Sequence, residues 1–223
     1  MIAIVDYGRG NLGSVEKAFA RIGMPAVVTQ APKVVDDAEA VVLPGDGAFH
    51  DAMGSLQALG LIAPLRACLE SERPFFGICL GYQLLFSESE EFGQGKGLDV
   101  IPGAVRRFPG NLKVPHMGWN QVEHRGDLAL FDGIPSGAHF YFVHSYYPEL
   151  AGDVELPGSR AHARPLGSRD IARPTFAWCE YGVRFPAAVQ QGRIHATQFH
   201  PEKSQRWGIR MLENFAALVK GGG

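Results

Sequence analysis

The chain has 223 residues, of which 46% are hydrophobic and 20% charged, values typical of one folded domain or two small ones. The 21 Lys and Arg residues nearly balance the 23 Asp and Glu residues, and the net charge of −2 argues against a nucleic-acid or anionic-membrane surface. The three cysteines, Cys68, Cys79 and Cys179, lack a C-x-x-C spacing, which argues against a zinc ribbon or a disulfide scaffold. The sequence shows neither a secretory signal pattern nor an apolar run near the roughly 20 residues of a membrane helix, so we expect a reduced, cytoplasmic protein.

Strands and helices are predicted to alternate over the first ninety residues. Short apolar runs predict four strands, at residues 2–5, 26–29, 40–43 and 75–78. Apolar residues at helical spacing predict helices at residues 14–22, at about 51–72 with a break near Gly60, and at 80–86. This order is typical of a parallel sheet with helices on its faces.

The second half of the chain is predicted to consist mainly of strands. These are expected at residues 105–108, 118–123 and 140–146, followed by a hairpin of 187–189 with 194–199 and a last helix at about 204–219. Residues 151–174 carry scattered Pro, Gly and Arg without a period, and we expect a surface insertion there. The predicted fold is α/β, with one domain over residues 1–220 and an open, mixed, mostly parallel sheet flanked by helices.

Cys79 lies where a strand is predicted to turn into a helix. The segment GICLGYQ places Gly77 and Gly81 two positions either side of it, the G-x-C-x-G form of a nucleophile elbow. A sharp turn of this kind needs small neighbours, and it raises the sulfur above the sheet at a helix N-terminus. The helix dipole and a nearby imidazolium then favour the thiolate. Cys68 and Cys179 lack such a setting, and we expect them to be core residues.

A nucleophilic cysteine needs a histidine, and the histidine needs an orienting carboxylate. The segment QFHPE supplies both, because side chains two apart in an extended chain share a face and Pro201 stiffens the link between His200 and Glu202. Glu202 is therefore expected to accept the imidazole N–H. On spacing alone, the alternative that His200 is an ordinary core histidine stays open.

These residues resemble the class I, triad-type glutamine amidotransferases. The family signature is GICLGYQLLF followed far downstream by QFHPEKS, and the resemblance covers essentially the whole chain. Four further motifs, DYGRGNLGSV, LPGDGAF, PHMGWN and YFVHSYY, narrow the resemblance to the glutaminase subunits of imidazole glycerol phosphate synthase. The resemblance implies a flavodoxin-like, open mixed sheet.

The resemblance also implies a reaction. Cys79 would attack the side-chain amide of glutamine, His200 would protonate the leaving ammonia and later activate water, and Glu202 would hold His200. The oxyanion hole would be formed by backbone N–H groups of three residues: Leu80, Asp46 and Gly47. Four positions match those that hold glutamine: Gly45, Gln83, His144 and Ser145. No cofactor and no metal are implied.

The partner implied by the resemblance is a separate (β/α)₈ cyclase subunit in a heterodimer. It would use the ammonia to make imidazole glycerol phosphate and aminoimidazole carboxamide ribotide in histidine biosynthesis. Three residues match interface positions: Asn11, Trp119 and Lys203. From the residues alone, other readings stay open: Asn11 could cap or turn the loop, Trp119 could be a core residue and Lys203 a solvated charge.

One residue departs from the family pattern, and three other functions remain open. Asp46 stands where related glutaminases often carry an uncharged residue, and its carboxylate is expected to point away from the oxyanion hole. The alternative functions are a triad amidotransferase for another ammonia acceptor, a stand-alone Cys-dependent hydrolase of the same fold, and a non-catalytic binding subunit. The motifs DYGRGN and PHMGWN argue against the first of these, and the intact Cys79, His200 and Glu202 argue against the last.

Overall fold

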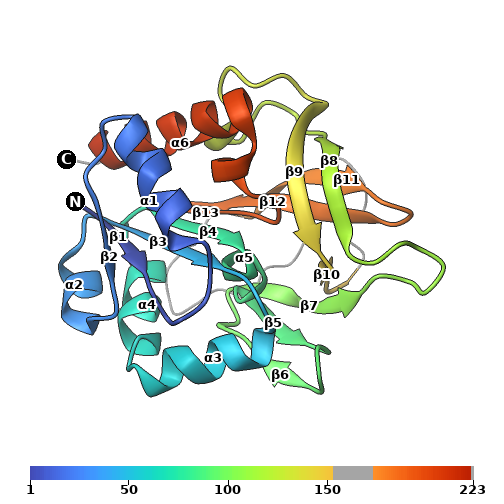
Figure 1. Cartoon of the computed structure of the whole chain (residues 1–223), viewed down its shortest axis with the longest axis horizontal. Coiled ribbons are helices and arrows are strands. Elements are labelled where there is room, and N and C mark those ends of the chain that lie inside the picture. Colours follow the sequence, from blue (N-terminus) through green and yellow to red (C-terminus); the bar gives the residue numbers. More distant parts are fainter. Residues whose placement is uncertain (153–172, 222–223) are drawn as a thin grey trace.

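The computed structural model of the chain describes residues 1–152 and 173–221 (Figure 1). Its centre is a seven-stranded sheet. In spatial order the strands are β11 (Thr175–Glu180), β12 (Arg184–Gln191), β13 (Ile194–Thr197), β4 (Phe75–Cys79), β3 (Ala40–Gly45), β1 (Ile2–Val5) and β2 (Ala26–Thr29). The five strands from β13 to β2 are parallel, whereas β11 and β12 are antiparallel additions at one edge.

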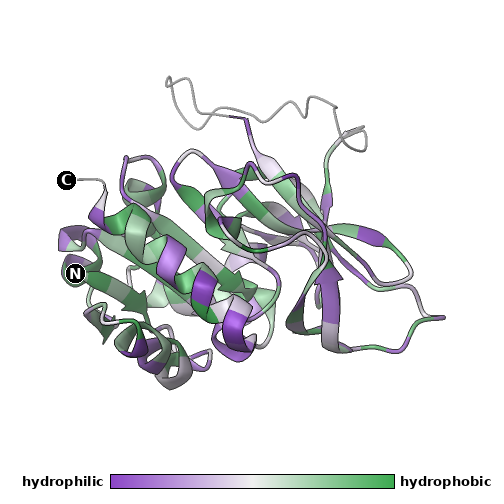
Figure 2. Cartoon of the chain, turned by 90° about the horizontal axis from the view of Figure 1, so that it is seen from above, coloured by the Kyte–Doolittle hydropathy of each residue, from purple (hydrophilic) through white to green (hydrophobic). Residues whose placement is uncertain are grey.

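The central strands are apolar on both faces because helices cover both faces. Strands β1, β3 and β4 are buried at every residue. Helices α1 (Leu12–Arg21) and α6 (Gln205–Lys220) pack on one face, and α2 (Pro32–Asp37), α3 (Phe49–Ala58) and α4 (Ile62–Leu69) on the other (Figure 1). In Figure 2 the strands are mainly hydrophobic, while hydrophilic and hydrophobic residues alternate along the helices. The sheet thus separates two apolar cores.

Two smaller sheets flank the main one. The first has the order β10 (Tyr146–Leu150), β7 (Ile101–Arg107), β5 (Phe86–Ser89) and β6 (Gly95–Lys96). The second is a ribbon of β8 (His116–Val122) and β9 (Ala138–His144), paired over all seven residues. Figure 1 shows this ribbon beside the start of α6, and the short helix η2 (Pro201–Lys203) contacts β9 there. A second short helix, η1 (Ala129–Phe131), connects β8 to β9 and packs on α6.

The α/β class and the mostly parallel sheet predicted from the sequence are confirmed. The predicted break in the helical region 51–72 is also confirmed, since α3 and α4 are separated at Gly60, whose φ of +68° favours glycine. The predicted helix 80–86 is wrong in length. It ends at Gln83, and the backbone of Leu84 and Leu85 instead bonds to residues 98–101, which leads the chain into β5.

Several elements were not predicted, namely helix α2, strands β5, β6 and β11 and the short helices η1 and η2, and one strand is divided. Helix α2 begins with Pro32 in its first turn, a position that tolerates proline. Strand β11 follows the insertion and pairs with β12 across a bulge between Ala177 and Trp178. The predicted strand 140–146 is divided at Ser145 between β9 and β10. Most of the expected surface insertion at 151–174 lies outside the described residues.

Within residues 1–152 and 173–221, no single helix has the length and apolarity needed to cross a membrane. Only α3 and α4 taken together pass that test, as a pair bent by 102°.

We predict that Gly81→Ala lowers the free energy of unfolding by about 1–3 kcal/mol, because a Cβ there would overlap the carbonyl oxygen of Leu43 in β3. The matched control is Gly54→Ala in α3, where a Cβ meets open space, and this change should stabilise the chain by up to about 1 kcal/mol. Urea unfolding followed by circular dichroism measures both. Equal effects of the two changes would contradict the close packing at Gly81.

Candidate active site

Cys79 ends β4 and stands directly before the one-turn helix α5 (Leu80–Gln83). Its φ of +56° and ψ of −106° are unusual for a residue with a side chain, and it lies opposite Gly45 at the end of β3. A backbone strained in this way persists only where its surroundings hold it, and such strain is concentrated at functional sites. Cys79 is 6% exposed, so its sulfur is nearly enclosed by the chain.

The two glycines around Cys79 have the steric role that the sequence predicts. A Cβ at Gly77 would lie 2.9 Å from the carbonyl oxygen of Gly81, and a Cβ at Gly81 would overlap the carbonyl oxygen of Leu43. Real Cβ atoms do not approach backbone this closely. The turn from β4 into α5 therefore closes only when both positions are glycine.

His200 lies beside Cys79 at the end of the strand segment that leads into η2. Its Nδ1 lies 2.7 Å from Oε1 of Glu202, whose side chain is 1% exposed. Since an ionised carboxylate only accepts, Nδ1–H is the donor. The other ring nitrogen is left for Cys79, whose sulfur favours the protonated form of the imidazole. The two-residue spacing of histidine and glutamate thus gives the shared face expected from the sequence.

The charges in this site favour an imidazolium at His200. Burial opposes the positive charge, but the charge of the Cys79 sulfur, its hydrogen bond and the Glu202 carboxylate together outweigh burial. The pKa of His200 is therefore raised from 6.5 to about 10. An imidazolium beside the sulfur is the partner that a nucleophilic cysteine needs in order to react as a thiolate.

A further polar contact to the sulfur was missed in the sequence analysis. The fully buried Gln198 places its Nε2 3.7 Å from Sγ of Cys79, and its Oε1 accepts a hydrogen bond from Gln83 Nε2 at 2.9 Å. The sequence held a signal for this contact. Gln198 precedes His200 by two residues in an extended segment, so the two side chains share a face.

Asp46 points away from the place where an oxyanion would form. Its Oδ1 accepts the backbone N–H of Gly10 at 2.9 Å, which ties the loop at residues 45–47 to the loop at residues 8–10. Arg9 from the second loop forms an ion pair with Asp51 in the first turn of α3, at 3.1 Å. The DYGRGN motif therefore holds the glycine-rich loop next to Cys79.

Tyr7 explains why position 45 is glycine. The Tyr7 hydroxyl is buried and has no hydrogen-bond partner among the described residues, and a Cβ at Gly45 would overlap it. Burial raises the pKa of Tyr7, and the nearby negative charges of Cys79 and Asp46 act in the same direction. A neutral hydroxyl therefore stands over the strand end that faces the nucleophile.

The residues expected to hold glutamine do not all direct a side chain at the sulfur. Gln83 donates to the carbonyl oxygen of Tyr146 at 2.9 Å as well as to Gln198. The imidazole of His144 faces His116, at 2.9 Å between ring nitrogens. Ser145 uses its carbonyl oxygen to accept from the backbone N–H of Phe108.

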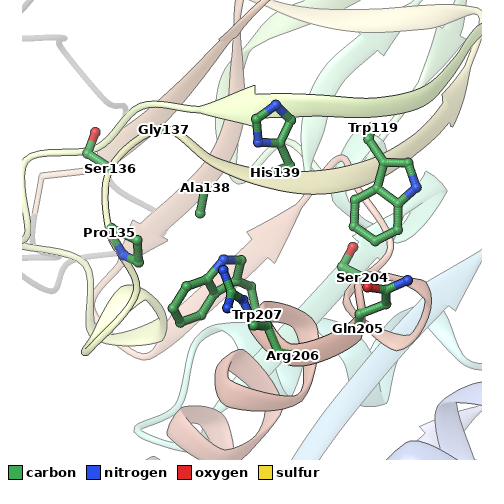
Figure 3. A pocket seen from close by; sticks show the side chains of 10 residues that line it. All are labelled: Trp119, Pro135, Ser136, Gly137, Ala138, His139, Ser204, Gln205, Arg206 and Trp207. Carbon is green, nitrogen blue, oxygen red and sulfur yellow. The ribbon is translucent and has the colours of Figure 1, made fainter.

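The three residues expected at a partner interface are all exposed. Asn11 also caps α1, since its side chain accepts the N–H of Ser14 at 3.4 Å. Trp119 is 46% exposed on β8 and lines a cavity of about 430 Å³ together with Ser204 and Gln205, which follow Lys203 (Figure 3). Trp119 is therefore not a core residue, and it lies near the chain segment that begins at Lys203.

The other two cysteines are buried and unsuited to react. Burial raises the pKa of Cys68 to about 11 and that of Cys179 to about 12. Both thiols are protonated at neutral pH, as expected of core residues.

The fold and this arrangement of Cys79, His200 and Glu202 define a class of protein, and comparison with known sequences agrees. Residues 3–219 match the family described as glutamine amidotransferase class-I, and the chain belongs to that family. Among solved structures, a crystal structure of a glutamine amidotransferase covers 99% of this chain and 100% of its own, with a TM-score of 0.71 at 18% identity. PurLQS from Thermotoga maritima gives a TM-score of 0.70 at 16% identity, with 97% of each chain covered. These distant structures support the fold alone.

Relatives at higher identity narrow the family. The chain is 49% identical to "Imidazole glycerol phosphate synthase subunit HisH" of Moorella thermoacetica, over 100% of this chain and 97% of the relative. It is 50% identical to the protein of the same name from Syntrophotalea carbinolica, over 98% of this chain and 100% of the relative. The HisH protein of Methanothermobacter thermautotrophicus is 46% identical, over 99% of this chain and 100% of the relative. Within the amidotransferases, the chain is thus a member of the HisH family, as the sequence motifs predicted.

We predict that Gly45→Ala lowers glutamine hydrolysis about 100-fold, because the added Cβ displaces the loop or the Tyr7 hydroxyl beside Cys79. Adding Tyr7→Phe removes the overlapping oxygen, so the double variant should recover at least about tenfold of that loss. Steady-state glutaminase assays measure Gly45→Ala, Tyr7→Phe and the double variant. A double variant no better than Gly45→Ala would show that the clash lies elsewhere.

Proposed function

We propose that this chain is the glutamine-hydrolysing subunit of an imidazole glycerol phosphate synthase, and that Cys79, His200 and Glu202 carry out the hydrolysis. The observation that carries the proposal is the strained elbow at Cys79, whose sulfur acts on the charge of an imidazole that Glu202 holds at 2.7 Å. The full-length identity of about 50% to HisH proteins supports the choice of this synthase over another amidotransferase or a stand-alone hydrolase.

The reaction begins with attack of the Cys79 thiolate on the amide carbon of glutamine. The carbon–sulfur bond forms as the carbonyl electrons move onto oxygen, and His200 then donates its proton to the departing nitrogen, which leaves as ammonia. In the second half, His200 takes a proton from water, and the hydroxide attacks the glutamyl thioester to release glutamate. Glu202 fixes the orientation of the imidazole in both halves through Nδ1.

The tetrahedral oxyanion is proposed to be held by backbone N–H groups of Leu80, Asp46 and Gly47. Leu80 follows the nucleophile, and the loop at 45–47 lies opposite Cys79 across β3 and β4. One such donor is worth about 3 kcal/mol in acyl transfer. The carboxylate of Asp46 accepts the N–H of Gly10 and therefore does not point at the developing charge.

Ammonia is proposed to pass to a cyclase subunit, a (β/α)₈ barrel, in a cytoplasmic heterodimer. Asn11, Trp119 and Lys203 are the candidate contacts, with Trp119 as an exposed aromatic anchor of the kind that dominates interface energies. Gly45, Gln83, His144 and Ser145 remain the positions proposed to surround the glutamine.

We predict that Cys79→Ala in the complex with the cyclase subunit lowers glutamine-dependent synthesis below about a thousandth of wild type and leaves ammonia-dependent synthesis intact. Only the thiolate forms the thioester, whereas free ammonia bypasses the glutaminase site. The matched control, Cys68→Ala, removes a buried, protonated thiol and should retain both activities. Glutamine turnover by Cys79→Ala above that limit would rule out Cys79 as the nucleophile.

We predict that Trp119→Ala weakens binding of the cyclase subunit at least about tenfold, equivalent to about 1.4 kcal/mol. Phe92→Ala removes an aromatic side chain that is 84% exposed on another part of the surface and should leave binding unchanged. Titration calorimetry with the purified cyclase subunit measures both dissociation constants. Equal affinities for wild type and Trp119→Ala would place the interface elsewhere.

A further inference from the structure

Polar side chains form a continuous line from strand β8 towards the active site. Asn120 Nδ2 lies 3.2 Å from His116 Nε2, and His116 Nδ1 lies 2.9 Å from His144 Nε2. His144 Nδ1 lies 2.8 Å from the carbonyl oxygen of Tyr146. The two imidazoles are buried, at 3% and 6% exposure. None of these contacts is needed for the proposed chemistry at His200.

The same carbonyl oxygen continues the line to the nucleophile. It accepts a second hydrogen bond, from Gln83 Nε2 at 2.9 Å. Gln83 also donates to Gln198 Oε1 at 2.9 Å, and Gln198 Nε2 reaches Cys79 Sγ at 3.7 Å. We call the set the polar relay; its members are Asn120, His116, His144, the Tyr146 carbonyl, Gln83 and Gln198.

The carbonyl oxygen determines where the protons of the two histidines lie. A carbonyl only accepts, so His144 carries its proton on Nδ1 and offers a lone pair at Nε2. His116 must then donate from its own Nδ1, which leaves its Nε2 to accept from the amide of Asn120. Burial lowers the pKa of His116 to about 4 and that of His144 to about 3, so both rings stay neutral at physiological pH.

Aromatic packing keeps these rings in place. His116 is stacked between Tyr181 and Phe142, with ring centroids 4.0 and 4.9 Å away. Phe108 and Phe185 pack against His144 at 5.2 and 5.4 Å. Rings enclosed in this way have little freedom to change rotamer, so a displacement of β8 is transmitted to His144 rather than absorbed.

We infer that the polar relay positions the sulfur of Cys79 and makes its position depend on β8, the strand that carries Trp119. The inference rests on the proposed function, because it concerns the same nucleophile. His116, His144 and Gln198 are positioning residues that act through hydrogen bonds.

The alternation of side chains along β8 gives the strand two separate faces. Met117 and Trp119 point outward and are 62% and 46% exposed. His116 and Asn120 lie on the other face and begin the relay. A partner subunit that shifts β8 through its outer face therefore moves the first hydrogen bonds of the relay. The test is therefore a direct measurement of the coupling between the two ends of the relay.

The first experiment is a double-mutant cycle with His116→Phe and Gln198→Leu in the complex with the cyclase subunit. The first variant keeps the aromatic stacking and removes the hydrogen bonds at one end, and the second removes the contact to sulfur at the other. Each should lower the glutaminase kcat about tenfold or more, and the double variant should be no worse than the poorer single variant. If the double variant instead lost kcat by the product of the two single losses, the two ends would act independently and the relay would be overturned.

The matched control is His195→Phe, which replaces a buried histidine of β13 whose Nδ1 has no hydrogen-bond partner among the described residues. When His195→Phe is combined with Gln198→Leu, the effects of the two changes on the glutaminase kcat should simply multiply. The rate of Cys79 alkylation by iodoacetamide, followed by mass spectrometry, provides a second measurement of the same cycle that does not depend on glutamine. If glutamine is not hydrolysed but alkylation shows the coupling, the proposed function fails and the relay stands.

The second experiment needs no variant to fold. Nitrogen-15 NMR of the histidine rings of the wild-type chain should show Nδ1–H tautomers at both His116 and His144, unchanged between pH 8 and 5.5. A proton on Nε2 of His144, or a charged ring in that range, would overturn the relay whatever the activity assays give.

Discussion

The site depends on one backbone constraint, the strained, positive-φ conformation of Cys79 between β4 and α5. The turn that holds this conformation forms only because Gly77 and Gly81 have no side chain. Backbone can then pack on backbone, with Gly81 against the carbonyl of Leu43. The adjacent strand β3 is therefore part of the elbow, and it continues directly into the glycine-rich loop at 45–47. Nucleophile and loop are thus positioned by the same two neighbouring strands.

The site contains buried histidines in two different charge states. His200 is stabilised as a cation, whereas His116 and His144 are kept neutral. Glu202 and the sulfur of Cys79 make an imidazolium favourable at His200, although burial alone would disfavour it. His116 and His144 lie among aromatic rings, with no carboxylate of residues 1–152 and 173–221 in contact, and burial keeps them neutral. One histidine is therefore prepared to transfer protons, whereas the other two hold fixed tautomers and serve as hydrogen-bonding groups.

The sequence was most informative where the chemistry is local. Cys79 with its flanking glycines, and His200 with Glu202, could be predicted because each set lies within five residues of chain. The fold class followed from the order of apolar runs. Helix α2 and strand β11 could not be predicted in the same way, since α2 has only six residues and β11 depends on pairing with β12. The carbonyl contacts of Leu84 and Leu85 that end α5 early involve residues about fifteen positions away.

Contacts between distant segments were also beyond the sequence analysis. The contact of the Tyr7 hydroxyl with Gly45 joins positions 38 residues apart in the chain, and the contact of Gln198 with Cys79 joins positions 119 residues apart. The expectation that Asp46 points outward came from electrostatics, but its acceptance of the Gly10 N–H required the structure. The neutral pair of His116 and His144 likewise joins two motifs, PHMGWN and YFVHSYY, whose pairing becomes visible only when β8 and β9 are aligned.

The hydrogen bond from Gly10 to Asp46 also gives the molecule an internal reporter. An amide proton that is bonded in this way exchanges with solvent only when the two loops separate. The exchange rate of this one amide is therefore a measure of how often the loop beside the nucleophile opens, at a position that touches neither the sulfur nor the imidazole. Loop opening and bond breaking in the active site can in this way be timed separately.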